Sequence, residues 1–243
     1  MKNLIGILLV LTTINAFAAS VVYEVDGRPY EGYYISPSDG APLVLLIHDW
    51  DGVTDYEIKR AGMLAEKGYA VFAADLFGKG VRPAEMSDRR KLTGELYADR
   101  EKMRALMNGS LDAARKQGAN ADNAVAMGYC FGGGCVLELA RSGAPLKGFV
   151  SFHGGLETPE GQDYSQTKGK LLVLHGAADE NITMEHFAAL AKDLERAGIP
   201  NEMISYGGAP HAFTVFGTDR YRADADKNSW TRFLEFLAET LNP

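Results

Sequence analysis

The sequence predicts an α/β protein in which a mostly parallel central sheet carries helices on both faces. Apolar runs such as 43–47 and 171–174 lack the alternation of a half-solvated strand, as expected where a strand is covered on both faces. Longer segments with helical periodicity separate these runs. Since parallel neighbours need crossovers of about helix length, this alternation favours a mostly parallel sheet.

The amino-terminal half is expected to hold four strands and two helical segments. Asp26-Gly27 separates the first two strands and is a dipeptide typical of two-residue hairpin turns. The helix after the third strand can be capped by Thr54 or Asp55, and Gly68 ends it. The long helical pattern after the fourth strand has one interruption, near Asn108-Gly109. The strands are expected at 21–25, 30–35, 43–47 and 69–74, and the helices at 55–67 and 86–117.

The carboxyl-terminal half alternates strands with helices more regularly. Glycines open the first of its helices, and Gly198-Ile199-Pro200 ends the second. In a parallel sheet, functional residues collect in the loops at the carboxyl ends of the strands. The strands are expected at 124–127, 148–152, 171–174 and 202–206, and the helices at 131–141, 184–197 and 223–241.

The composition is that of a globular chain with a sizeable core. Hydrophobic residues make up 46% of the 243 residues, which suits one domain of this length. Asp and Glu number 32 against 25 Lys and Arg, and no basic cluster is present, so nucleic acid and anionic membranes are not expected partners. The sequence has no zinc-ligand spacing, P-loop or dinucleotide fingerprint, and we expect neither a metal nor a cofactor.

The first 18 residues have the form of an export signal. Lys2 supplies one positive charge, residues 4–14 are mostly apolar, and Ala16-Phe17-Ala18 predicts cleavage before Ala19. The alternative is a retained anchor, but the apolar run is shorter than the roughly 20 residues that a spanning helix needs. We therefore expect a periplasmic domain, residues 19–243, that leaves the membrane once the signal is removed.

A candidate nucleophile lies between the strand at 124–127 and the helix at 131–141. Gly128-Tyr129-Cys130-Phe131-Gly132 matches the G-x-S-x-G turn with cysteine in place of serine. Bulky residues two positions away would clash in so sharp a turn, and the helix amino terminus favours a thiolate. The Phe131 backbone N–H would point at a developing oxyanion. A buried structural cysteine beside a glycine-rich turn is the alternative.

The second cysteine, Cys135, lies about one turn into the same predicted helix. An oxidising compartment favours disulfides, but a helix that starts after Cys130 would point the two side chains apart. We therefore expect at least one free thiol, with a chemical role for Cys130 and a place in the core for Cys135.

A candidate acid and base follow in the chain, each just after a predicted strand. Asp179 is placed to orient an imidazole, and His211 lies in a loop rich in glycine and proline. The order Cys130, Asp179, His211 is that of the α/β-hydrolase triad and predicts that fold. A surface aspartate and a loop histidine are each ordinary when taken alone. The other histidines, at 48, 153, 175 and 186, are expected to be structural or on the surface.

The loop 48–52 after the third strand is expected to face Cys130. A second oxyanion donor belongs in this loop, and the backbone N–H of Trp50 is the candidate. Asp49 is a candidate for tuning the thiol, because a nearby carboxylate opposes thiolate formation. A surface aspartate is the equally open alternative.

With these residues in view, the chain resembles the dienelactone hydrolase (carboxymethylenebutenolidase) family. The resemblance implies a thiol nucleophile, an acyl-enzyme intermediate, no cofactor, and an acidic residue near the resting thiol, where Asp49 stands in place of the more usual Glu. It also implies an arginine that holds a substrate carboxylate. Arg100 and Arg104 are candidates for that role, and a solvated helix face is the alternative. The segments that carry the resemblance are 48–52, 74–77, 128–133, 175–179 and 211–213.

The sequence therefore predicts a hydrolase that cleaves a small ester or lactone through a Cys-His-Asp triad and a thioacyl-enzyme intermediate. We expect an open site in a monomer or small homo-oligomer, with 86–117 as the stretch long enough to shape a cap. An acyltransferase on the same scaffold is one alternative. A non-enzymatic thiol redox or ligand-binding protein is the other.

Overall fold

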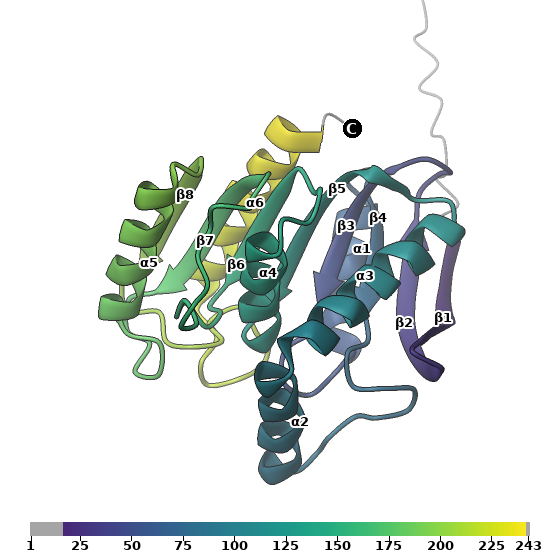
Figure 1. The fold of residues 1–243 in the computed structure, drawn as a ribbon, viewed down its shortest axis with the longest axis horizontal. Coiled ribbons are helices and arrows are strands. Elements are labelled where there is room, and N and C mark those ends of the chain that lie inside the picture. Colours follow the sequence, from purple (N-terminus) through teal and green to yellow (C-terminus); the bar gives the residue numbers. More distant parts are fainter. Residues whose placement is uncertain (1–16, 242–243) are drawn as a thin grey trace, which may run out of the picture.

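The computed structural model describes residues 17–241 and shows the predicted α/β architecture (Figure 1). Within these residues, eight strands form one sheet in the order β1-β2-β4-β3-β5-β6-β7-β8. The strands from β3 to β8 run parallel, and the hairpin β1-β2 adds antiparallel to the β4 edge. The sheet is therefore mostly parallel, as expected for the α/β-hydrolase fold.

The strands are β1 (Phe17–Val25), β2 (Arg28–Ser36), β3 (Pro42–Ile47), β4 (Ala70–Ala74), β5 (Asn120–Tyr129), β6 (Gly148–Phe152), β7 (Lys170–Gly176) and β8 (Asn201–Tyr206). The helices are α1 (Asp55–Ala65), α2 (Met86–Ala98), α3 (Arg100–Lys116), α4 (Phe131–Arg141), α5 (Met184–Ala197) and α6 (Ala223–Leu241).

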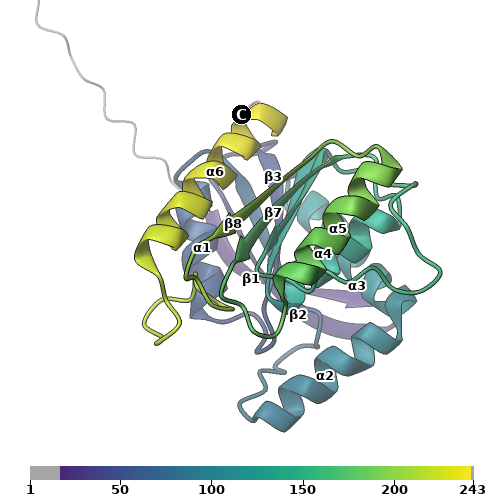
Figure 2. The same ribbon diagram turned by 90° about the vertical axis from the view of Figure 1, so that its left-hand side faces the viewer.

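Helices cover both faces of the sheet, with α1 and α6 on one face and α3, α4 and α5 on the other (Figure 2). The strand β3 shows why its sequence is apolar throughout. Leu43, Leu45 and Ile47 pack toward the α3–α5 face, whereas Val44 and Leu46 pack toward α1 and α6. All five side chains are fully buried, so no position could be polar without a partner.

Thr54, and not Asp55, caps α1. The Thr54 hydroxyl accepts from the Tyr56 N–H, and Glu57 accepts in return from the Thr54 N–H at 2.8 Å. This reciprocal pair satisfies donors that a helix amino terminus otherwise leaves free. The loop after β3 is thereby fixed where it enters α1.

The predicted interruption of the long helical pattern near Asn108-Gly109 is wrong. Both residues lie inside α3, and the break falls at Asp99, between α2 and α3. Asp99 caps α3 by accepting from the Lys102 N–H at 3.0 Å. Gly109 serves packing instead, since a Cβ there would lie 2.5 Å from Val25 Cγ2 on β1.

The hairpin β1-β2 confirms the predicted turn, because Asp26 and Gly27 both have positive φ, at 50° and 71°. Phe17 and Ala18 pair with β2, so the expected cleavage before Ala19 falls inside β1. The rest of the predicted signal lies outside the described residues. None of the helices in residues 17–241 has the length and apolar character needed to cross a bilayer.

Gly62 in α1 and Gly109 in α3 should respond oppositely to alanine. Gly62→Ala in α1 meets open space and should raise the free energy of unfolding by about 0.5–1 kcal/mol through helix propensity. Gly109→Ala should lower it by about 1 kcal/mol, because the methyl group overpacks against Val25. Urea unfolding of the two variants measures both. Equal stabilisation by the two substitutions would contradict close packing of α3 on β1.

Candidate active site

Cys130 occupies a strained turn between β5 and α4. Its φ of 52° and ψ of −113° lie in a region that side chains rarely adopt. A Cβ on Gly128 would lie 2.3 Å from the Gly132 carbonyl, and one on Gly132 would lie 2.3 Å from the Ile47 oxygen. The glycine spacing predicted from the sequence is therefore a steric requirement, which brings the helix start against the end of β3.

The loops after β7 and β8 bring Asp179 and His211 to the turn of Cys130. His211 Nε2 lies 3.1 Å from Sγ, and His211 Nδ1–H donates to Asp179 Oδ2 at 2.7 Å. The other carboxylate oxygen of Asp179 accepts from the backbone N–H groups of Asn181 and Ile182, at 2.9 and 3.0 Å. The structure thus joins the three residues in one hydrogen-bonded chain.

The protonation states of His211 and Asp179 place an imidazolium beside the sulfur. Burial lowers the pKa of His211, but the bonds to Asp179 and Cys130 outweigh it and raise that pKa to about 10. Burial raises the pKa of Asp179, but bonds from His211 and Ile182 hold it below its ordinary value. His211 is therefore protonated at neutral pH, opposite an ionised Asp179.

Both cysteines are free, as expected. Cys135 is fully buried in α4, and burial raises the pKa of its thiol well above the ordinary value. It stays a neutral core residue.

The sequence model of the dienelactone hydrolase family matches residues 30–241. The chain belongs to the dienelactone hydrolase family. It resembles a dienelactone hydrolase-like promiscuous phosphotriesterase from metagenomic libraries, with 30% identity and a TM-score of 0.86 over 93% of this chain and 98% of that one. A relative from Salmonella typhimurium, provisionally named carboxymethylenebutenolidase, is 27% identical over 93% of this chain and 88% of its own length. Thermogutta terrifontis esterase 2, at 21% identity and a TM-score of 0.67 over 93% of this chain and 96% of its own, shares the fold. The protein is a hydrolase.

In this dienelactone hydrolase family member, Asp49 does not oppose a thiolate with a negative charge. Burial first, then a hydrogen bond with Asp51 and the nearby Glu57 raise the pKa of Asp49 to about 10. The carboxyl group is therefore neutral near pH 7. Its Oδ1 accepts from the Asp51 N–H at 3.0 Å, and among the described residues no hydrogen bond joins it to Cys130.

Of the two candidate oxyanion donors, Phe131 lies in the Cys130 turn and Trp50 lies in the loop after β3. Phe131 is the first residue of α4, where a backbone N–H has no carbonyl partner within the helix. Its ring packs against Tyr97 and Phe77, at centroid distances of 5.3 and 5.7 Å. The Trp50 ring lies under the Arg89 guanidinium, 5.4 Å away. Sequence reasoning missed this aromatic wall, because Tyr97 and Phe77 come from separate segments with no shared motif.

The candidate substrate arginines, Arg100 and Arg104, both bind Glu138. The Glu138 side chain is fully buried, and it accepts from Arg100 Nη1 at 3.0 Å, Arg104 Nε at 2.7 Å and Arg141 Nη2 at 2.8 Å. Burial raises the pKa of Glu138, but bonds from Arg141 and Arg104 lower it more. The arginines therefore tie α3 to α4. Arg100 also lines a cavity of about 350 Å³ beside Tyr97.

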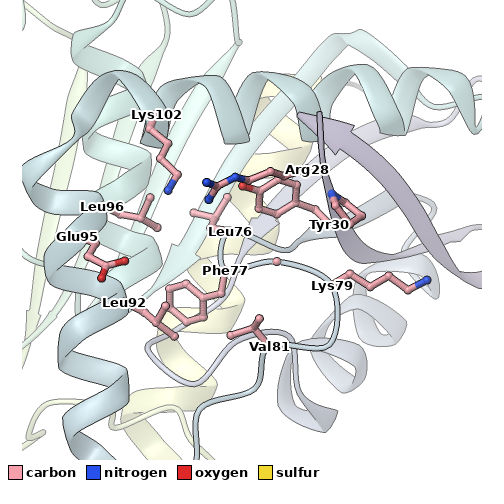
Figure 3. Close-up of a pocket in the computed structure, with 12 residues that line it drawn as sticks. Arg28, Tyr30, Leu76, Phe77, Lys79, Val81, Leu92, Glu95, Leu96 and Lys102 are labelled. Carbon is pink, nitrogen blue, oxygen red and sulfur yellow. The ribbon is translucent and has the colours of Figure 1, made fainter. Parts of the chain in front are cut away.

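A second cavity, of about 370 Å³, lies between the β1-β2 turn, the loop after β4, and helices α2 and α3 (Figure 3). Phe77 lines it, as Figure 3 shows, so the ring that packs on Phe131 also forms a wall of this space. Arg28 and Lys102 point toward it (Figure 3). Within residues 17–241, no three His, Cys, Asp or Glu side chains gather as a metal site would require.

Glu138→Gln should lower the free energy of unfolding by about 3 kcal/mol, because an amide leaves three guanidinium groups without a counter-charge. The folded-state pKa of Glu138 is depressed, so the stability it contributes is present above its unfolded pKa and is lost as pH falls through the folded value. The difference in free energy of unfolding between the wild type and Glu138→Gln, measured by urea unfolding, should therefore shrink toward pH 3.

The matched control is Glu202→Gln, whose partly exposed pair with Arg232 should cost under ~1 kcal/mol. A Glu138→Gln deficit as small as this control would show that the buried cluster adds no stability.

Proposed function

We propose that this hydrolase cleaves a small ester or lactone through Cys130, His211 and Asp179, with a thioacyl-enzyme intermediate. The observation that carries the proposal is the unbroken chain from Sγ to Nε2 at 3.1 Å and from Nδ1 to Oδ2 at 2.7 Å. A nucleophile and base within hydrogen-bond reach, with the base oriented by a third group, is the arrangement that activates a thiol. The names of the relatives agree with this reaction class.

In acylation Sγ reacts as a thiolate, with the proton held on His211 Nε2, where the bond to Asp179 stabilises the imidazolium. Sγ attacks the carbonyl carbon, and the carbon–oxygen π electrons move onto the oxygen. The N–H groups of Phe131 and Trp50 bind this oxyanion. Its collapse breaks the ester C–O bond, and the alkoxide takes the proton from His211 Nε2, which leaves a thioester on Cys130.

Deacylation uses the same groups in reverse. Water gives a proton to His211 Nε2 and attacks the thioester carbonyl. The C–S bond then breaks, the acid is released, and the thiolate again faces an imidazolium. Asp179 holds the imidazole in the required tautomer and stabilises its positive charge. Because Asp49 is neutral, it places no negative charge against the ion pair of Cys130 and His211.

Steady-state hydrolysis of p-nitrophenyl acetate and a panel of small lactones tests the proposal. Cys130→Ala should lose at least ~10³-fold in kcat/KM, as expected for removal of a nucleophile. Cys135→Ala is the matched control, because this second cysteine is buried and outside the hydrogen-bonded chain, and it should keep activity within about threefold. Equal rates for Cys130→Ala and the wild type would refute the role of Cys130. Trapping the acyl group with added alcohols would identify an acyltransferase.

We infer further that residues 1–18 direct the chain to the periplasm and are removed there. The A-x-A pattern at 16–18 and the short apolar run support this. Expression of the full chain in a Gram-negative host should give a periplasmic protein that begins at Ala19, as mass spectrometry of the intact protein would show. A membrane-bound protein that still begins at Met1 would overturn the inference in favour of an anchor.

A further inference from the structure

A fully buried histidine, His153, holds the backbone of the nucleophile turn. The Cys130 N–H donates to His153 Nδ1 at 3.2 Å and to the Phe152 carbonyl at 3.0 Å. Since Nδ1 accepts, it carries no proton. Burial and the neighbouring His211 lower the pKa of His153 well below its ordinary value, so the ring is neutral and its proton lies on Nε2.

The same ring reaches the loop that carries His211. His153 Nε2–H donates to Thr214 Oγ1 at 2.8 Å. Thr214 is fully buried and follows His211 by three residues. The His153 ring also packs edge-on against the His211 ring, with centroids 5.4 Å apart. One side chain therefore contacts both the turn of Cys130 and the loop of His211.

Thr214 is in turn held by hydrogen bonds to α1, which is joined to α6. Its hydroxyl shares a hydrogen bond with the Tyr56 hydroxyl at 2.7 Å, and its carbonyl accepts from Arg60 Nη2 at 2.9 Å. Arg60 is buried and pairs with Asp226 on α6. The loop of His211 is thus anchored to α1 and α6 through one threonine.

Backbone strain marks the same residues. Cys130, His153 and Ala212 have φ values of 52°, 40° and 62°, and a side-chain residue keeps such a conformation only where its surroundings impose it. Cys130 lies in the nucleophile turn and Ala212 in the loop of His211, and His153, which follows β6, forms hydrogen bonds to both segments. A small relaxation here would move Sγ away from Nε2, and a misplacement of about 1 Å costs up to ~10²-fold in rate.

We propose that His153 and Thr214 are positioning residues. They hold the turn of Cys130 and the loop of His211 together, so that Sγ and Nε2 stay 3.1 Å apart. The catalytic consequence rests on the proposed function, whereas the effect on the thiol does not. Neither residue touches the reacting atoms. They act through the Cys130 backbone and through the loop that carries the imidazole.

The test replaces the hydroxyl and keeps the shape of the side chain. In a Cys135→Ala background, which leaves one thiol, Thr214→Val should lower kcat about 10- to 100-fold and leave KM within about threefold. Alkylation of Cys130 by iodoacetamide should slow at least about fivefold, because His211 no longer stabilises the thiolate as well. Thr214→Ser keeps the hydroxyl and should stay within about threefold of the parent in both measurements.

Thr240→Val is the matched control, because Thr240 Oγ1 is a buried hydroxyl that has no hydrogen-bond partner among residues 17–241. It should change neither rate. If Thr214→Val does not fold, His153→Asn supplies the same comparison. Asparagine tolerates positive φ and can accept from the Cys130 N–H, but it is too short to reach Thr214.

Alkylation and kcat within twofold of the parent in the valine variant, or in the asparagine variant if only that one folds, would overturn the proposal. Equal loss in Thr214→Ser and Thr214→Val would overturn it as well, since the hydroxyl would then not matter. If no ester or lactone is hydrolysed but the alkylation rates differ as expected, the proposed function fails while the positioning role stands.

Discussion

The site depends on one constraint, the sharp turn that holds Cys130 in a conformation with positive φ. The turn exists only because Gly128 and Gly132 have no side chains, so α4 can start directly against the carbonyl groups that end β3. That close approach places Sγ above the carboxyl edge of the sheet. It also puts the sulfur at the amino terminus of α4, where unpaired N–H groups favour negative charge.

The charges of the buried groups around Cys130 also favour a thiolate. Asp179 is buried and accepts hydrogen bonds from two backbone N–H groups and from the His211 imidazole, so it keeps its negative charge. That charge stabilises the protonated form of His211. The pKa of His211 rises in consequence, while burial keeps Asp49 neutral and His153 uncharged. The group that lies 3.1 Å from the sulfur, His211, is therefore a cation, and a cation in that place stabilises a thiolate.

Contacts among helices α2, α3 and α4 shape the surroundings of the site. A buried Glu138 draws Arg100 and Arg104 from α3 onto α4, so arginines that could have stood free for substrate serve first to join two helices. Helix α2 lies beyond the carboxyl edge of the sheet in both views of the ribbon (Figures 1 and 2). The ring of its Tyr97 packs against the ring of Phe131. A side chain near the nucleophile thus comes from a helix in which Leu96 is the one buried residue.

The sequence alone predicted most of the strands and helices and identified Cys130, Asp179 and His211 as candidates, because apolar periodicity, the glycine spacing around Cys130 and the chain order of the three residues are readable along the chain. The predicted break between α2 and α3 was misplaced, because a glycine in a helical pattern can either end the helix or leave room for a packed neighbour. Gly109 does the second, since it leaves room for Val25. The neutral state of Asp49 and the contacts of His153 follow instead from the folded arrangement. Those properties depend on burial and on partners distant in the chain, which no local pattern records.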